Sequence, residues 1–456
     1  MQILAGADVV TMNPRRDVLV GGSVLIDDDL IAGVGSTSVL AADHPTAEVV
    51  DVTGCVITPG MIDAHQHLTG DPLVRCCIPD LLPSGAAIFE WSVPLHAVHE
   101  SLDDEVSATV AAVEALTNGV TTMVEAGTVA DGDAVARAIT GVGIRATLGV
   151  WGWDIEEGPH VAPADEVLDR QRAIVERYPP GGRVEGWVTL VGHDLASDAL
   201  LAGAADLARE LGTGMTMHLS PTSSDPEQYL ARTGRRPVEH LDALGVLGAH
   251  LLIGHGVWLD DAEVDLVLES RTAIAYCPWA YLRLGQGVFA NSRHAEIVER
   301  GGRVALGCDS ANAGDSIDVL RAAAAAVGIA RDARLDPTRF GAHDAFALAT
   351  VAGAEAIGLG DRIGSIEVGK QADLVVHRTD TPGWNPRGDL AMQLVWGTDG
   401  RSVRDVYVAG RHVVGDGRVL NVDTDALFAE AAERQSSLLR RAGIELPSIW
   451  PLRDAT

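Results

Sequence analysis

Between residues 119 and 310, short apolar runs alternate with longer stretches that place apolar residues at helical spacing. Apolar runs of this kind, which carry few charges and end in polar residues, are typical of strands buried on both faces. They occupy residues 119–127, 145–152, 184–194, 213–220, 249–257, 272–278 and 303–310. Segments 196–212 and 260–270 are examples of the helical pattern between them. With the run at 55–68, eight strand–helix units predict an α/β fold with a (β/α)8 TIM barrel over residues 55–360.

The two ends of the chain have a different pattern. Residues 1–54 and 361–420 alternate apolar and polar positions with a period of two, and turn signals such as Gly21-Gly22 interrupt them. Because neither flank is long enough to bury a core alone, we expect the two to pair into one small β-sandwich. The last part, residues 421–456, is expected to form a C-terminal helix and tail, with the helix over 425–443.

Composition narrows the choice of partners. The chain has 456 residues and a formal net charge of −30, which disfavours binding to nucleic acid or to anionic membranes. No uninterrupted apolar run is long enough to span a membrane, and the first arginines follow the apolar residues, unlike in a signal peptide. Five cysteines without a C-x-x-C pair argue against a disulfide framework. We therefore expect a cytoplasmic protein that acts on a small molecule.

Histidines and one aspartate stand where the predicted barrel strands end. His65 and His67 alternate on the first strand, so both imidazoles face the same side and can meet one metal ion. His218, His255 and Asp309 end later strands, at the edge where barrel active sites are built. These residue types fill a core poorly without partners, so their common position predicts an active site.

Five motifs in this order resemble the amidohydrolase superfamily, in particular its branch of cytosine deaminases, guanine deaminases and triazine chlorohydrolases. The resemblance spans nearly the whole chain and implies one divalent metal ion bound by His65, His67, His218 and Asp309. Zinc is the first expectation, and iron, cobalt and manganese stay open. It also implies that Asp309 acts as general base and that His255 lies beside the water and the substrate. The motifs are TPGMIDAHQHL (58–68), MHLS (217–220), IGHGVWL (253–259), LGCDS (306–310) and IGSIEVGKQADLVV (363–376).

A single lysine limits the number of metal ions. Binuclear members of the superfamily bridge their metals with a carbamylated lysine on the fourth strand, but residues 184–194 contain none. The only lysine, Lys370, falls in the predicted sandwich. We therefore predict a mononuclear site. Glu125, at the end of the second strand, is expected to be a polar strand terminus rather than a ligand of a second metal.

One departure from the family bears on the reaction. Deaminases of this branch carry a glutamate three residues after the histidine of the fifth strand, and this chain has Pro221 there. The sequence therefore favours a metal-bound hydroxide that cleaves a C–N or C–S bond at an amide-like carbonyl. A urea, carbamate, thiocarbamate or amide of a small, largely apolar molecule fits, as for the phenylurea and thiocarbamate (molinate-type) hydrolases.

Two other functions are weighed against this one. The first is an aminohydrolase or dechlorinase of an N-heteroaromatic ring such as a purine, pyrimidine or triazine. It would need a replacement acid, for which His193, Asp225 and Glu227 are candidates. The second is a catalytically silent barrel used for binding, against which the complete set of ligands argues.

The substrate pocket is expected to draw on the long segment 69–96, a lid or an oligomer contact. We name Phe89, Trp91, His193 and Trp279 as candidate substrate contacts, since they stand in that segment or near strand ends. Relatives often place a substrate-contacting histidine where His193 stands. They also tend to be dimers or larger, so a homodimer or higher homo-oligomer is expected.

Overall fold

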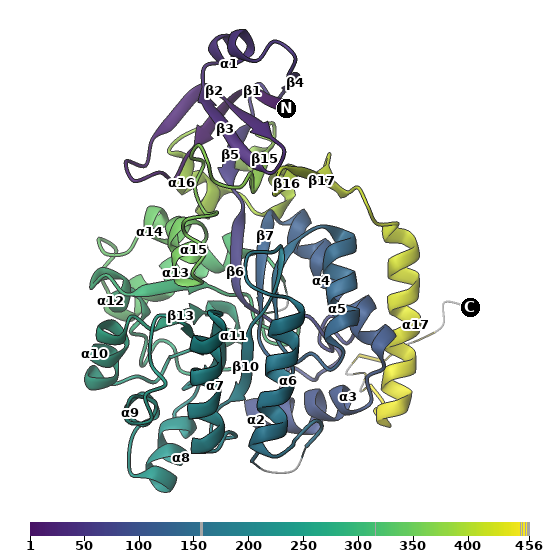
Figure 1. Ribbon diagram of the computed structural model, residues 1–456, viewed down its shortest axis with the longest axis vertical. Helices are drawn as coiled ribbons and strands as arrows, with labels where there is room; N and C mark the ends of the chain where they lie inside the picture. The colour runs from purple at the N-terminus through teal and green to yellow at the C-terminus, as the bar shows by residue number, and fades with distance from the viewer. Residues whose placement is uncertain (156–157, 315, 447, 449, 452, 454–456) are drawn as a thin grey trace.

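The computed structural model describes residues 1–155, 158–314, 316–446, 448, 450–451 and 453. Its core is a barrel of parallel strands, as predicted, and a ring of helices surrounds this barrel (Figure 1). One part of the barrel has the strand order β6-β7-β8-β9 and the other the order β10-β11-β12-β13-β14. Beyond β14, the backbone N–H of Asp309 donates to the carbonyl of His65 at 2.8 Å, which joins the last strand position to the first. The strands are β6 (Met61–Gln66), β7 (Val120–Glu125), β8 (Arg145–Leu148), β9 (Val184–Gly186), β10 (Val188–Gly192), β11 (Met215–Leu219), β12 (Leu251–His255), β13 (Ala273–Tyr276) and β14 (Arg303–Leu306).

Capping residues mark the ends of some of the helices around the barrel, as α7 shows. Ser197 accepts a hydrogen bond from the N–H of Leu200 and starts α7, which ends at Gly212 in the left-handed conformation. An N-terminal cap of this kind stabilises a helix by about 1 kcal/mol. The helices are α4 (Ser101–Thr117), α5 (Gly132–Val142), α6 (Ala164–Arg177), α7 (Asp198–Leu211), α8 (Ser224–Thr233), α9 (Pro237–Ala243), α10 (Asp261–Ser270), α11 (Pro278–Arg283), α12 (His294–Glu299), α13 (Val319–Arg334), α14 (Ala342–Leu348) and α15 (Val351–Ala356).

Both ends of the chain form one separate, mostly antiparallel sheet. Strand β5 joins the two ends, since it pairs in parallel with β1 and antiparallel with β15. The chain passes from this sheet to the barrel at Gly60, a few residues after the boundary expected at residue 55. The nine strands are β1 (Gln2–Val10), β2 (Val18–Asp27), β3 (Leu30–Gly35), β4 (Glu48–Asp51), β5 (Val56–Pro59), β15 (Leu374–His377), β16 (Val403–Val408), β17 (Arg411–Gly415) and β18 (Arg418–Val419).

Shorter elements and one buried ion pair complete this end of the molecule. Arg145, at the start of β8, forms a buried ion pair of 3.1 Å with Asp373, which precedes β15, and so ties the barrel to the sheet. The short elements are α1 (Thr37–Asp43), the 3-10 helices η2 (Pro382–Trp384) and η4 (Gly400–Ser402), α16 (Leu390–Met392) and the π-helix η3 (Gln393–Gly397).

The C-terminal helix covers the segment that follows β6. This segment contains α2 (Ser84–Ala86), the π-helix η1 (Ala87–Ser92) and α3 (Val93–Ala97), and α17 (Thr424–Ala442) runs beside it (Figure 1). Leu438 and Leu439 of α17 share one apolar cluster with Leu73, Val74 and Leu95. The helix therefore holds a loop of the barrel mouth in place. Of the expected tail, residues 447, 449, 452 and 454–456 lie outside the described residues.

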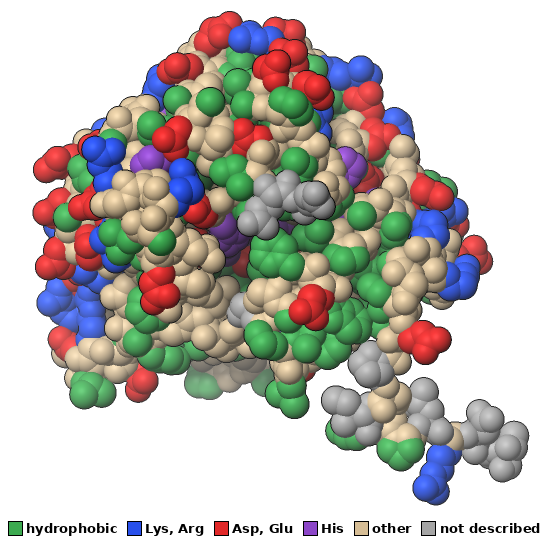
Figure 2. Space-filling view, turned by 90° about the horizontal axis from the view of Figure 1, so that it is seen from below, with side chains coloured by type: hydrophobic (Ala, Val, Ile, Leu, Met, Phe, Trp, Pro, Cys, Tyr) green, Lys and Arg blue, Asp and Glu red, His purple; other side chains and the backbone are tan. Residues whose placement is uncertain are grey.

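The barrel strands run away from the end sheet, so their C-terminal ends meet at the opposite end of the molecule. Figure 2 looks onto that end and shows histidine atoms in a hollow that hydrophobic side chains border. Within the described part of the chain, no helix is both long enough and apolar enough to cross a membrane.

Candidate active site

The five residues predicted from the strand ends come together in the barrel mouth. His65 lies on β6 and His67 directly follows it, His218 lies on β11, His255 ends β12, and Asp309 follows β14. All five are at least nine-tenths buried. The Nε2 atom of His67 lies 3.4 Å from Oδ1 of Asp309 and 3.3 Å from Nε2 of His218, and Nε2 of His65 lies 3.9 Å from the same Asp309 oxygen. The side chains therefore converge on one point.

Two of these residues have an unusual backbone conformation. His255 and Asp309 adopt positive φ angles of 84° and 63°, in the left-handed region that residues other than glycine rarely occupy. Such a conformation costs about 1–3 kcal/mol and persists where the surrounding structure enforces it, often at active sites. The fold thus holds these two side chains in place at a cost to stability.

The donor set fits a divalent metal ion. Neither ring nitrogen of His65, and not Nδ1 of His255, has a hydrogen-bond partner among the described residues, although both rings are buried. Burying a polar atom without a partner is costly, and a bound cation would remove that cost. One nitrogen each of His65, His67 and His218 lie within 4.8 Å of one another. Imidazole nitrogens with a carboxylate oxygen suit zinc and similar metals.

Cys277 is a neighbour of the site that the motifs did not single out as a ligand. Its sulfur belongs to a second group of ligand atoms, with His65, His255 and Asp309, that also lie within 4.8 Å of one another. Burial raises the pKa of the Cys277 thiol well above its ordinary value, which favours the neutral form. Because the thiolate is the form that binds metals, this geometry alone does not make Cys277 a ligand.

Burial and mutual repulsion set the charges in the cluster. Burial, with the neighbouring imidazoles, lowers the pKa of His65 and His218 well below its ordinary value, and burial lowers the pKa of His255 to about 4. Burial opposes ionisation of Asp309 as well, but contact with His67 and the nearby imidazoles holds its pKa below the usual range. Neutral imidazoles and a charged carboxylate are the forms that bind a metal.

Partners outside the cluster fix two of the imidazoles. Nδ1 of His218 donates to the carbonyl of Val191 at 2.7 Å, which leaves Nε2 facing the cluster. Nδ1 of His67 lies 3.3 Å from the hydroxyl of Thr128, which in turn donates to the carboxylate of Glu125 at 3.1 Å. Contacts of this kind orient metal-binding histidines. Thr128 has no motif around it, and the sequence did not suggest its role.

A cavity of about 130 Å³ opens beside the predicted ligands. Its exposed wall is mostly apolar, although about half of the residues that line it are polar, with three of the predicted metal ligands among them. It continues outward into a more polar cleft of about 430 Å³, and the two share Ile88, Phe89, His193, Leu195, Pro221 and Gln286. A mostly apolar pocket with few convergent polar groups is typical of a small-molecule site.

The structure places two of the four expected substrate contacts in this lining and not the other two. Phe89 and His193 line the cavity, whereas Trp91 and Trp279 do not. Residues 88, 89, 92, 93 and 96 line it, a helical spacing that turns residue 91 to another side. The ring of Trp279, on α11, lies against the guanidinium of Arg321 at 4.8 Å. Nearness to a strand end did not distinguish these positions.

His193 forms a pair with Asp225 at the edge of the cavity. Its Nδ1 atom lies 3.0 Å from Oδ2 of Asp225, which also accepts the backbone N–H of Ser220 at 2.9 Å. Burial works against a charged ring, but Asp225 raises the pKa of His193 above its ordinary value. Glu227, the other candidate acid near Pro221, is exposed on α8. The geometry therefore favours His193 with Asp225 as the proton-carrying pair.

Other cavity residues were not identified from the sequence. Asp71 and His96 are both buried in the lining, and both come from the loop region 69–96 that was expected to contribute. The carboxylate of Asp71 accepts from the amide of Asn312 at 2.7 Å. Gln286 is also buried, and its Oε1 atom has no partner among the described residues. Only their place in long loops could have pointed to them.

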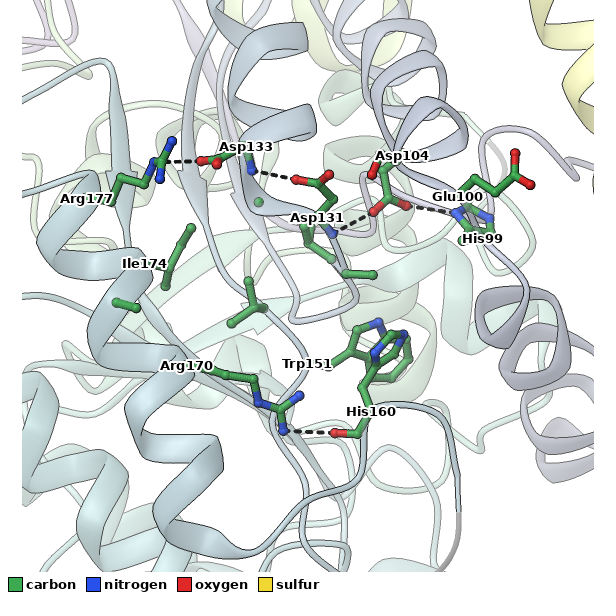
Figure 3. A pocket seen from close by; sticks show the side chains of 16 residues that line it. His99, Glu100, Asp104, Asp131, Asp133, Trp151, His160, Arg170, Ile174 and Arg177 are labelled. Carbon is green, nitrogen blue, oxygen red and sulfur yellow. Dashed lines mark hydrogen bonds and ion pairs between the residues drawn. The ribbon is translucent and has the colours of Figure 1, made fainter.

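A second cavity, of about 540 Å³, lies beside the first (Figure 3). Trp151 lines both, but none of the five predicted site residues lines the second. Much of its charge is paired internally: Arg177 contacts Asp133 at 2.7 Å, and His99 contacts Asp104 at 2.8 Å. The reaction is therefore assigned to the smaller cavity.

Comparison with known proteins shows to which family the chain belongs. The amidohydrolase family model matches residues 56–413. A 5-methylthioadenosine/S-adenosylhomocysteine deaminase from Syntrophobacter fumaroxidans is 31% identical over 439 residues, which cover 93% of this chain and 95% of that protein. A zinc-bound adenosine deaminase from Xanthomonas campestris has a TM-score of 0.90 and 26% identity, covering 96% of this chain and 98% of that one.

A third relative extends the structural likeness. The zinc-complexed atrazine chlorohydrolase from Arthrobacter aurescens has a TM-score of 0.87 and 22% identity, covering 95% of this chain and all of that one, and this likeness concerns the fold alone. The family match and the deaminase relative go further, because they span most of the chain. This protein belongs to the amidohydrolase family.

Proposed function

We propose that the protein is a zinc-dependent aminohydrolase that replaces the amino group of an N-heteroaromatic ring with oxygen. The similar proteins named as 5-methylthioadenosine/S-adenosylhomocysteine and adenosine deaminases support this choice, and they make 6-aminopurine nucleosides the first candidate substrates. They favour the alternative weighed in the sequence over hydrolysis at a urea or thiocarbamate carbonyl. We propose one zinc ion per chain, with His65, His67, His218 and Asp309 as ligands.

The reaction joins the oxygen of water to the ring carbon and releases the amino nitrogen as ammonia. Zinc at this point supplies water of lowered pKa, and so a nucleophile near neutral pH. The carboxylate of Asp309, 3.4 Å from Nε2 of His67, is placed to take a proton from that water. His255, buried at the end of β12, is placed to stabilise the charge that develops when the ring carbon is attacked.

The pair of His193 and Asp225 is the observation that carries the proposal. A deaminase must protonate the ring nitrogen, and Pro221 has no side-chain group that can do so. His193 lines the cavity, and Asp225 occupies its Nδ1 atom, so the other ring nitrogen is the one available to a substrate. With its pKa raised by Asp225, the ring favours the protonated form that can donate. His193 thus supplies the acid that Pro221 lacks.

The shape of the site agrees with a substrate made of two parts. The apolar inner cavity, with Trp151 and Trp153 in its wall, suits a flat ring system. The outer cleft, whose lining includes Thr222, Ser224 and Gln228, suits a substituent that forms hydrogen bonds. A nucleoside has both parts.

The test is release of ammonia from a panel of adenosine, 5′-methylthioadenosine, S-adenosylhomocysteine, guanine and cytosine by the zinc-loaded protein. N-aryl ureas and thiocarbamates are incubated in parallel, because Pro221 favours a carbonyl substrate. We expect ammonia from at least one purine and no amine or thiol from the carbonyl compounds. Turnover of carbonyl compounds alone would overturn the proposal.

A further inference from the structure

Glu125 ends β7 and is fully buried beside the site, yet its carboxylate is held by its own loop. Oε2 accepts the backbone N–H of Gly127 at 2.6 Å, and Oε1 accepts the backbone N–H of Thr128 at 3.0 Å. Oε1 also accepts the hydroxyl of Thr128 at 3.1 Å. Both oxygens are therefore occupied, and Glu125 acts on the site through the loop it organises.

The direction of these hydrogen bonds fixes the state of His67. A threonine hydroxyl has one proton, and here that proton goes to the carboxylate of Glu125. The oxygen of Thr128 is then an acceptor for Nδ1 of His67, 3.3 Å away, so Nδ1 carries the proton of that ring. When the ring is neutral, Nε2 of His67, which faces Asp309 and His218, is therefore the nitrogen available to a metal. This is the tautomer that metal binding requires.

His67 differs in this respect from His218. A main-chain carbonyl, that of Val191, orients His218, and a backbone contact of this kind survives most substitutions. The orientation of His67 depends instead on a side chain. The backbone of Thr128 is fixed too, because its carbonyl accepts the hydroxyl of Thr69 at 2.8 Å. The hydroxyl of Thr128 therefore has a defined position opposite His67.

We propose that Thr128 and Glu125 are positioning residues that hold His67 in the tautomer and orientation for metal binding, in a chain from carboxylate to hydroxyl to imidazole. The inference rests on the metal-binding part of the proposed function and is independent of the substrate. Removing such a partner typically weakens metal binding roughly 10- to 100-fold.

The test compares three variants by competition between the protein and a chromophoric chelator for zinc. Thr128→Val keeps the shape but removes the hydroxyl, and we expect a roughly 10- to 100-fold weaker zinc affinity. Thr128→Ser restores the hydroxyl and is expected to restore the affinity. Thr213→Val is the matched control: Thr213 is buried just before β11, at the end of the barrel away from the site, and its hydroxyl donates to the carbonyl of Gly186 at 2.6 Å.

A second readout separates positioning from general stability. The melting temperature of the metal-free protein is expected to be similar in Thr128→Val and Thr213→Val, whereas the rise on adding zinc shrinks only in the former. Wild-type zinc affinity in Thr128→Val, or an equal loss in Thr213→Val, would overturn the relay and leave the deaminase proposal standing. If the wild-type protein does not bind zinc, the metal-dependent function fails and the relay fails with it.

Discussion

His193 and Asp225 lie 3.0 Å apart, Nδ1 to Oδ2, across the edge of the active-site cavity. The same Asp225 oxygen accepts the backbone N–H of Ser220, two residues after His218. One carboxylate thus orients His193 and is anchored to the strand that carries a proposed metal ligand. This chain has proline at position 221, and the pair provides another route by which a proton can reach the substrate ring.

Replacing His193 with Asn is expected to lower kcat for ammonia release by roughly 10²- to 10⁴-fold, the usual contribution of a general acid. Asp225→Asn should also lower kcat, because it removes the charge that favours the protonated ring. Steady-state kinetics on the best purine of the panel measure both. Glu227→Gln is the control, since this exposed carboxylate two residues from Asp225 should not matter. Activity that depends on Glu227 and not on His193 would refute this assignment.

Asp309→Asn should reduce turnover by roughly 10³-fold or more, as expected for a group with no substitute in the site. An amide cannot accept the proton of the attacking water, and it is a weaker ligand than a carboxylate. The barrel should stay folded, which circular dichroism can verify. Asp332→Asn, an exposed carboxylate on α13, serves as the comparison. A fully active Asp309→Asn protein would contradict the role of Asp309.

Removal of the metal should destabilise the protein. A ligand that binds only the folded state stabilises it by about 2.7 kcal/mol when its concentration is 100 times its dissociation constant. Without a cation, the buried nitrogens of His65 stay unpaired. Thermal unfolding before and after treatment with a chelator, and after zinc is restored, measures the effect. An unchanged melting temperature throughout would argue against a bound metal.

His377 makes the stability of the end sheet depend on pH. Burial lowers the pKa of His377 to about 3 from 6.5, so the folded protein keeps this ring neutral between Thr58 and Ser402. Between these two pH values the unfolded chain binds a proton that the folded chain does not. The free energy of unfolding therefore falls as pH drops below 6.5, by up to about 1.4 kcal/mol per unit from this group.

The variant His377→Asn can still form hydrogen bonds but does not titrate. Urea unfolding at several pH values between 4 and 7 should give a shallower dependence for the variant than for the wild type. Identical slopes would mean that His377 is not held neutral in the folded protein.

The sequence was sufficient for the barrel and the convergence of its polar residues, because both follow from periodicity. Parallel strands place their C-terminal ends together, so His65, His218 and Asp309 had to meet once the strands were identified. The pattern of apolar residues does not reveal that residues 184–194 divide into β9 and β10 at Trp187. Periodicity of the strands does not give the direction of a side chain in the segments that follow them, and for that reason Trp91 and Trp279 were expected in the pocket while Asp71 and Thr128 were not.

The reaction was harder to predict than the site. Pro221 shows only that the family's glutamate is missing at one position, and this absence favoured a carbonyl substrate. The replacement that we propose for the missing acid comes from a different loop and from α8, and only the folded structure shows that His193 and Asp225 touch. The expected alternative, ring deamination, becomes the better explanation once that contact is known.

The most direct test of the account is mass spectrometry of the product formed from 5′-methylthioadenosine or adenosine in water enriched in ¹⁸O. The account predicts that the ring loses its amino nitrogen as ammonia and gains one ¹⁸O atom, with the rest of the molecule unchanged. The zinc-free protein and the Asp309→Asn variant should give no such product. An intact purine, together with amine or thiol released from the ureas or thiocarbamates, would contradict the assignment as a ring aminohydrolase.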